Sequence, residues 1–246
     1  MVQTHADSTG SEPALARRLM RLADRGALAT TLAPEGLEDP RRAPYASFVL
    51  LASDLDGSPI LLLSDLADHS RNLAADPNAA LLLAPAAGAA EPLAEPRLTL
   101  IGRLRPESPD RLRARFLDRH PGAALYAGFG DFRCYRMAVR KGHLVAGFGR
   151  IRWLDARALL LGQEALSFWP EGSNRARRMN VDEPDLVDRL GVRASGMAGP
   201  WRLTGIDAEG CDFRAGERTA RLDFAKPAAS VDTALELMRL AGGVSA

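Results

Sequence analysis

The sequence has no continuous stretch of 18 or more apolar residues, and residues 1–12 are polar. A membrane-spanning helix needs about 20 apolar residues, and a secretory signal needs an apolar central region. We therefore expect a cytoplasmic protein with no membrane partner and a flexible N-terminus over residues 1–12. The two cysteines, Cys134 and Cys211, form no C-x-x-C pair. They predict reduced, buried thiols and exclude a disulfide framework or a zinc site.

Catalytic signatures are also missing. The sequence contains no H-E-x-x-H, G-x-S-x-G or P-loop pattern, and its four histidines are widely scattered: His5, His69, His120 and His143. Hydrolytic or metal-centred chemistry by protein groups alone is therefore not expected. An enzyme with this sequence would rely on a cofactor, and no catalytic residue is assigned.

Aromatic residues are scarce, at 6% of the chain, and the net charge of +1 hides an asymmetry. Residues 1–96 hold 7 basic and 13 acidic side chains (−6), residues 97–157 hold 14 and 5 (+9), and residues 158–246 hold 11 and 13 (−2). The basic middle segment favours a small anionic ligand. The alternative is a solvated helix face, since four arginines share one predicted helix: Arg111, Arg113, Arg115 and Arg119. Without interleaved aromatics, nucleic acid is not expected as a partner.

Short apolar runs separated by turn signals predict strands, and single helices interrupt them. Helices are expected from Ser11 to Gly26, at 68–75 and at 109–119, and Lys141-Gly142 is interpreted as a turn. The pattern favours an α+β fold built on an antiparallel barrel or sandwich. The predicted strands are 27–32, 45–52, 60–63, 79–84, 98–104, 132–139 and 144–148.

A composition shift predicts a second domain. We expect a β-rich domain over residues 13–157, a linker over 158–173 and a small α+β domain over 174–246. Within that second domain, helices are predicted at 174–190 and 233–240, and strands at 201–206, 211–214 and 219–224.

The segment after the third predicted strand is suited to phosphate. A helix that begins near Asp68 would direct free N–H groups and its positive dipole end outward, with Ser70 and Arg71 in its first turn. Arg71 could add a charge-assisted pair. The alternative is that Ser64, Asp65 and Asp68 cap the helix while Arg71 is solvated.

Several ordered motifs carry a family resemblance over residues 15–155. Together with two runs farther along the chain, they resemble the haem-utilisation branch of the pyridoxamine 5′-phosphate oxidase-like proteins and its C-terminal domain. The motifs are Pro44-Tyr45-Ala46-Ser47-Phe48-Val49, residues 62–73 with Asp76-Pro77, residues 96–102, Gly147-Phe148-Gly149 with Trp153-Leu154, and the later runs 179–183 and 205–210.

The resemblance implies an antiparallel Greek-key split β-barrel that forms a homodimer, with ligand sites at the subunit interface. In such relatives FMN lies at that interface, so residues 13–157 are identified as an FMN-binding split-barrel domain. The residues matching the phosphate site are Ser64, Ser70 and Arg71, and the strand matching Ser47 and Val49 lies beside the ring. The cofactor-binding set implied by the resemblance is Ser47, Val49, Ser64, His69, Ser70, Arg71 and Asn72.

Two departures from the family pattern bear on activity. Ala46–Leu51 stands where true pyridoxamine-phosphate oxidases carry an Arg-x-x-Leu-Lys run, which argues against pyridoxal phosphate synthesis. Glu183 stands where the C-terminal motif has histidine, and carboxylate is a poor ligand for haem iron. If haem binds, His69 is the first candidate ligand, followed by His143 and His120.

Three functions remain. The first is a flavin-dependent oxidoreductase with FMN and an unknown acceptor, and the second is a haem-binding or haem-degrading protein that uses the same interface. The third is a non-enzymatic ligand-binding dimer. The flavin hypothesis ranks first because the phosphate-compatible helix start is present, whereas the C-terminal histidine is not.

Overall fold

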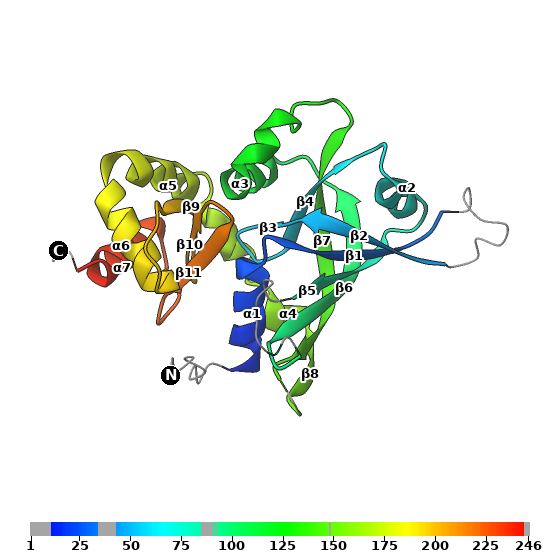
Figure 1. Ribbon diagram of the computed structural model, residues 1–246, viewed down its shortest axis with the longest axis horizontal. Coiled ribbons are helices and arrows are strands. Elements are labelled where there is room, and N and C mark those ends of the chain that lie inside the picture. The colour runs from blue at the N-terminus through cyan, green and yellow to red at the C-terminus, as the bar shows by residue number, and fades with distance from the viewer. Residues whose placement is uncertain (1–10, 34–42, 85–90, 92, 148, 244–246) are drawn as a thin grey trace.

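The structure is a computed structural model that describes residues 11–33, 43–84, 91, 93–147 and 149–243 (Figure 1). The predicted flexible N-terminus up to residue 10 and Phe148 of the Gly147-Phe148-Gly149 motif lie outside the described residues. In the part of the chain that the structure describes, no helix is long and apolar enough to cross a membrane.

An antiparallel sheet of eight strands, counted within the described residues, curls into a half-barrel (Figure 1). Its order is β2-β1-β5-β6-β7-β4-β3, and β8 pairs with the second half of β7. This arrangement confirms the predicted split barrel with flanking helices. The strands are β1 (Arg25–Thr31), β2 (Pro44–Leu50), β3 (Ala52–Ser53), β4 (Pro59–Ser64), β5 (Asn78–Leu83), β6 (Arg97–Pro106), β7 (Phe132–Val145) and β8 (Ile151–Asp155).

The inner face of this sheet holds the main core. Alternate side chains of a strand point to opposite faces, and in β6 Leu98 and Leu100 are fully buried whereas Ile101 is 40% exposed. Three helices add apolar side chains to the same core: α1 (Glu12–Leu22) gives Ala16 and Met20, α2 (Asp68–Ala75) gives Leu73, and α4 (Ala156–Leu159) gives Leu159.

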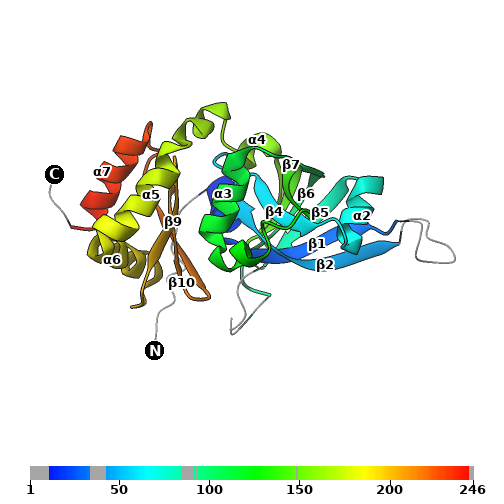
Figure 2. The same cartoon turned by 90° about the horizontal axis from the view of Figure 1, so that it is seen from above.

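A second core lies on the outer side of β3, β4 and the first half of β7. Helix α3 (Asp110–Arg119) and the 3-10 helix η2 (Pro121–Leu125) cover it, with Leu112 and Phe116 packed against Ile60 and Leu62. Figure 2 shows α2 and α3 on one side of the β1–β2 ribbons. The helices predicted at 68–75 and 109–119 are therefore confirmed within one residue.

The strand predicted at 132–139 and the first two residues of the one predicted at 144–148 belong to the single strand β7, which ends at Val145. Lys141-Gly142 is a strand segment, so its interpretation as a turn is wrong. A register shift between Ile101 and Gly102 of β6 takes up one extra residue of β7. A Cβ at Gly142 would lie 2.8 Å from a methyl carbon of Leu159. This glycine therefore permits close packing of α4 against β7.

A separate three-stranded sheet with helices on it follows the barrel, and we call residues 163–243 the C-terminal domain. The strand order is β11-β10-β9. The helix predicted at 174–190 is wrong as a single helix: α5 ends before Glu183 and α6 begins at Pro184. A proline disfavours helical backbone in the residue before it, which explains the break. The elements are η3 (Gln163–Phe168), α5 (Glu171–Asp182), α6 (Pro184–Ser195), β9 (Arg202–Asp207), β10 (Gly210–Ala215), β11 (Arg218–Asp223) and α7 (Val231–Ala241).

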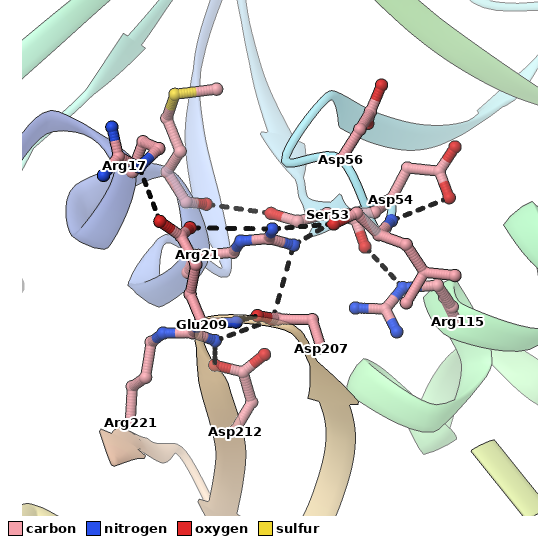
Figure 3. A network of polar contacts seen from close by, with 12 residues as sticks. Arg17, Arg21, Ser53, Asp54, Asp56, Arg115, Asp207, Glu209, Asp212 and Arg221 are labelled. Atoms are coloured by element: carbon pink, nitrogen blue, oxygen red, sulfur yellow. Dashed lines mark hydrogen bonds and ion pairs between the residues drawn. The ribbon is translucent and has the colours of Figure 1, made fainter. Parts of the chain in front are cut away.

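Buried ion pairs join the two domains through α1 (Figure 3). Arg21 donates to the carbonyl oxygens of Asp54 at 2.7 Å and Leu55 at 2.8 Å, and its guanidinium lies 3.4 Å from the Asp207 carboxylate. Arg221 of β11 donates to Asp207 at 2.9 Å. The run 205–210 noted in the sequence thus binds the barrel domain through Asp207.

The arginines of α3 bind within the barrel domain, where they tie this helix to α1, β3 and the turn that follows β3. Arg111 pairs with Asp54 at 3.1 Å, and Arg115 donates to the Ser53 carbonyl at 2.7 Å. Arg119 donates to the Leu22 carbonyl at 2.7 Å. Because Arg115 and Arg119 are buried, the expectation of a solvated basic face on this helix is wrong for them. They are equally unavailable to an anionic ligand.

Candidate functional site

The predicted phosphate-binding residues at the start of α2 have protein partners. Ser64 Oγ donates to Asp131 Oδ2 at 2.5 Å. Arg71 donates to the Leu66 carbonyl at 2.8 Å and lies 3.5 Å from Asp68. A phosphate held by these two side chains would lie near the carboxylates of Asp68 and Asp131. The arrangement therefore does not fit a phosphate unless both side chains exchange partners.

The next residues of α2 face the interior. Ser70 is 4% exposed, and its Oγ has no hydrogen-bond partner among the described residues. His69 Nδ1 lies 3.3 Å from Ser47 Oγ, while its Nε2 is buried without a described partner. Burial lowers the pKa of His69, against the opposing effect of Asp68. The structure places His69 in contact with Ser47, and the Nε2 atom of His69 is closed to solvent there.

Asn72 and Val49 make contacts that hold the barrel together. Asn72 Nδ2 donates to Thr30 Oγ1 at 2.9 Å, and its Oδ1 accepts the Ala33 N–H at 2.7 Å, so this amide ties α2 to β1. Val49 is 4% exposed and belongs to the barrel core. The predicted set thus spreads from the core to the surface, and its role in binding FMN stays a prediction.

Glu183, at the position where the resemblance expects histidine, lies in the C-terminal domain between α5 and α6. Its carboxylate is 3.5 Å from Arg239 of α7. Its described contact is therefore an ion pair within that domain.

The outer side of the sheet carries a row of side chains that crosses six strands. Residues directly opposite one another on antiparallel strands place their side chains on the same face. The pairings therefore define one continuous row across six strands, which we call the open face together with its neighbours in β6. The row runs through Phe48 (β2), Ala27 (β1), Leu82 (β5), Thr99 (β6), His143 (β7) and Trp153 (β8).

The open face is apolar and uncovered in the described residues. Phe48 is 71% exposed, Trp153 59%, Ile101 40% and Leu82 38%. Scattered apolar side chains are ordinary on protein surfaces, but a contiguous row that spans a sheet marks an interaction site.

Polar groups are placed within this apolar surface. The His143 ring stacks on Trp153, with centroids 4.6 Å apart and an interplanar angle of 29°. Arg103 follows Ile101 on the same side of β6, and its Nε is buried with no hydrogen-bond partner among the described residues. Arg140 and Lys141 are exposed at the neighbouring bulge. The combination suits a large, planar, apolar ligand that carries carboxylates.

Two hollows lie elsewhere and contain none of the predicted site residues. One, of about 350 Å³, lies at the start of α3 beside Arg113 and Cys134, and burial raises the pKa of the Cys134 thiol. The other, of about 290 Å³, lies between α1 and β11. Its arginines are all paired with carboxylates: Arg17, Arg18, Arg21 and Arg221.

A curled antiparallel sheet with flanking helices, part of whose outer face is uncovered in the described residues, defines a split-barrel protein. More particularly, the chain belongs to the CREG β-barrel family, because the model of that family matches residues 8–159.

Similar proteins include two solved structures that align over nearly the whole chain. The protein Atu2129 of Agrobacterium tumefaciens strain C58, described as of unknown function, is 26% identical with a TM-score of 0.79 and covers 98% of each chain. A heme binding protein from Mycobacterium smegmatis is 27% identical with a TM-score of 0.56, over 96% of this chain and 100% of that one.

A curated relative matches more locally. The chloroplastic "Non-canonical heme oxygenase HOZ" of Arabidopsis thaliana is 36% identical over 107 residues, which is 42% of this chain and 32% of that protein. The chain thus aligns with about a third of the length of this relative.

Proposed function

We propose that this protein binds haem on the open face, within a homodimer in which two copies pack these faces together. The observation that carries the proposal is the largely apolar row across six strands, which includes His143, with Arg103 farther along the same side of β6. In the described residues neither the His143 ring nitrogens nor Arg103 Nε has a hydrogen-bond partner. The names of the Mycobacterium smegmatis and Arabidopsis thaliana relatives support haem as the ligand.

The residues of the open face fit the chemistry of haem. Leu82, Ile101 and Trp153 offer exposed apolar surface to the macrocycle. Arg103 and Lys141 offer donors to its propionates, and charge-assisted hydrogen bonds to carboxylates are among the stronger polar contacts. When bound, haem supplies an iron whose reactivity is set by its axial ligand and surroundings. Haem degradation, by contrast, stays a prediction.

The homodimer is proposed on the same surface. Two copies of one face form a self-complementary contact, the commonest symmetry of protein dimers. Phe48, at 71% exposure, lies at the edge of the row. Contact with a second copy would remove its apolar surface from water, which is favourable. A ligand held between the two faces would be shielded from solvent on both sides.

Absorption spectroscopy with added haemin tests this proposal. We expect a saturable Soret band and a dimer by sedimentation equilibrium. Ile101→Glu places a charge within the open face and should weaken haem binding at least tenfold and shift the dimer towards monomer. Val181→Glu is the matched control, because Val181 is 77% exposed on α5 of the other domain.

The outcomes separate the three functions. Uptake of FMN at micromolar concentration in place of haemin would contradict this proposal and support the flavin oxidoreductase. A dimer that binds neither would support the non-enzymatic ligand-binding protein. Equal haem affinity in both variants would show that the open face is not the site.

A further inference from the structure

The three histidines in the described residues differ in what their ring nitrogens can reach. His120 is 5% exposed, and its Nε2 lies 2.6 Å from the Leu51 carbonyl. His69 contacts Ser47 through Nδ1, and its Nε2 is buried beside α2. His143 is partly exposed, and neither of its nitrogens has a hydrogen-bond partner among the described residues.

The geometry points to His143 as the residue that would hold the haem iron, an inference that rests on the proposed function. A neutral imidazole is a common protein ligand of haem iron. Of the histidines that the structure describes, His143 is the one on the open face. This order replaces the expectation from the sequence that His69 comes first.

The strands around His143 hold its ring in place. β7 is paired with β6 through Thr99 and with β8 through Trp153 on either side of His143. The stacked indole restricts rotation of the imidazole and leaves its nitrogens free. Trp153 is therefore a positioning residue, comparable to the outer contacts that orient other metal-bound histidines.

A second observation on the same face points to a ligand with an anionic group. Arg103 Nε is buried yet has no hydrogen-bond partner in the described residues. A buried donor without a partner costs free energy, so it marks a place where an acceptor belongs. Arg103 lies two residues from Ile101 on β6, and Ile101 neighbours Thr99, the residue opposite His143. Arg103 is thus four residues along β6 from the residue opposite His143, about 13 Å at the rise of a β-strand. A ligand that contacts both groups must therefore be large, with its carboxylates directed towards Arg103.

Haemin titration with spectra of the iron coordination tests the assignment. In wild-type protein we expect a histidine-ligated Soret spectrum and an iron–histidine stretch in the resonance Raman spectrum of the ferrous form. His143→Ala and His143→Gln should lose that stretch and bind haemin at least tenfold more weakly. Added imidazole should restore the spectrum of His143→Ala. Trp153→Ala should weaken the stretch, and Trp153→Phe should retain it.

His69→Ala is the matched control and should keep the wild-type spectrum. A stretch that survives in both His143 variants, or is lost in His69→Ala, would overturn the assignment while haem binding stands. Absence of any haem binding by the wild type would instead refute the proposed function. Circular dichroism of each variant checks the fold, which should persist because His143 is partly exposed.

Discussion

At the scale of single residues, His120 is set up to make stability depend on pH. Burial lowers its pKa to about 4, although the hydrogen bond to the Leu51 carbonyl opposes the shift. In the unfolded chain a histidine has a pKa of about 6.5. Between these values the unfolded state binds more protons, so stability falls as the pH falls. From pH 7 to pH 5 this histidine should remove about 2 kcal/mol.

Urea denaturation of wild type and His120→Gln at pH 7 and pH 5 measures this contribution. The wild type should lose about 2 kcal/mol more than the variant between the two pH values, since glutamine does not titrate. An identical loss in both proteins would mean that His120 does not keep its low pKa in the folded state.

At the scale of elements, α2 is anchored by Asn72. Asn72→Ala leaves the Ala33 N–H and the Thr30 hydroxyl without their partner. A buried polar group left unpaired costs about 1–3 kcal/mol, so the variant should lose about 2–3 kcal/mol of unfolding free energy. Chemical denaturation measures this loss.

Arg71→Ala is the comparison in the same helix. Its side chain is 58% exposed, and exposed ion pairs contribute little. It should change stability by less than about 0.5 kcal/mol. If Asn72→Ala were as mild, the amide would not anchor α2, and its predicted role in binding a cofactor would gain weight.

The elements that could be predicted from sequence are those with a clear local signal. The helix at 68–75 follows a strand and turn residues, and it appears as predicted. The prediction of a turn at Lys141-Gly142 is wrong because the sequence does not distinguish a glycine required by close packing in a strand from one required by a turn. Likewise, the break at Glu183 depends on Pro184, because the effect of proline on the residue before it overrides the helical pattern on either side.

At the scale of the whole molecule, the open face could be predicted only in part. In β6, alternation of Leu98 and Leu100 with Thr99 and Ile101 shows which side chains point outward. Which strands lie beside one another, and in what register, depends on long-range pairing that short motifs do not encode. The row that joins Phe48 to Trp153 therefore required the structure.

The junction between the two domains rests on buried charge, and Asp207 is central to it. Burial alone would raise the pKa of Asp207, but the charges of Arg21 and Arg221 outweigh it and hold the pKa well below its usual value. A lowered carboxyl pKa stabilises the fold at pH values above that of the unfolded group, about 3.9. The contribution is lost as the pH falls from there through the folded pKa.

Asp207→Asn should therefore destabilise the protein strongly near neutral pH. Removing one partner leaves the buried Arg21 and Arg221 without their carboxylate, which costs roughly 3–5 kcal/mol. The deficit should be constant from pH 7 to pH 5. It should shrink below about pH 4, where the Asp207 carboxyl of the unfolded wild type becomes protonated while that of the folded protein stays ionised. Asp223→Asn is the control, because Asp223 is 40% exposed where it pairs with Arg221, and its effect should be about 1 kcal/mol or less. Urea midpoints across this pH range provide the measurement. Equal losses in the two variants would show that the buried carboxylate is not what holds the C-terminal domain to the barrel.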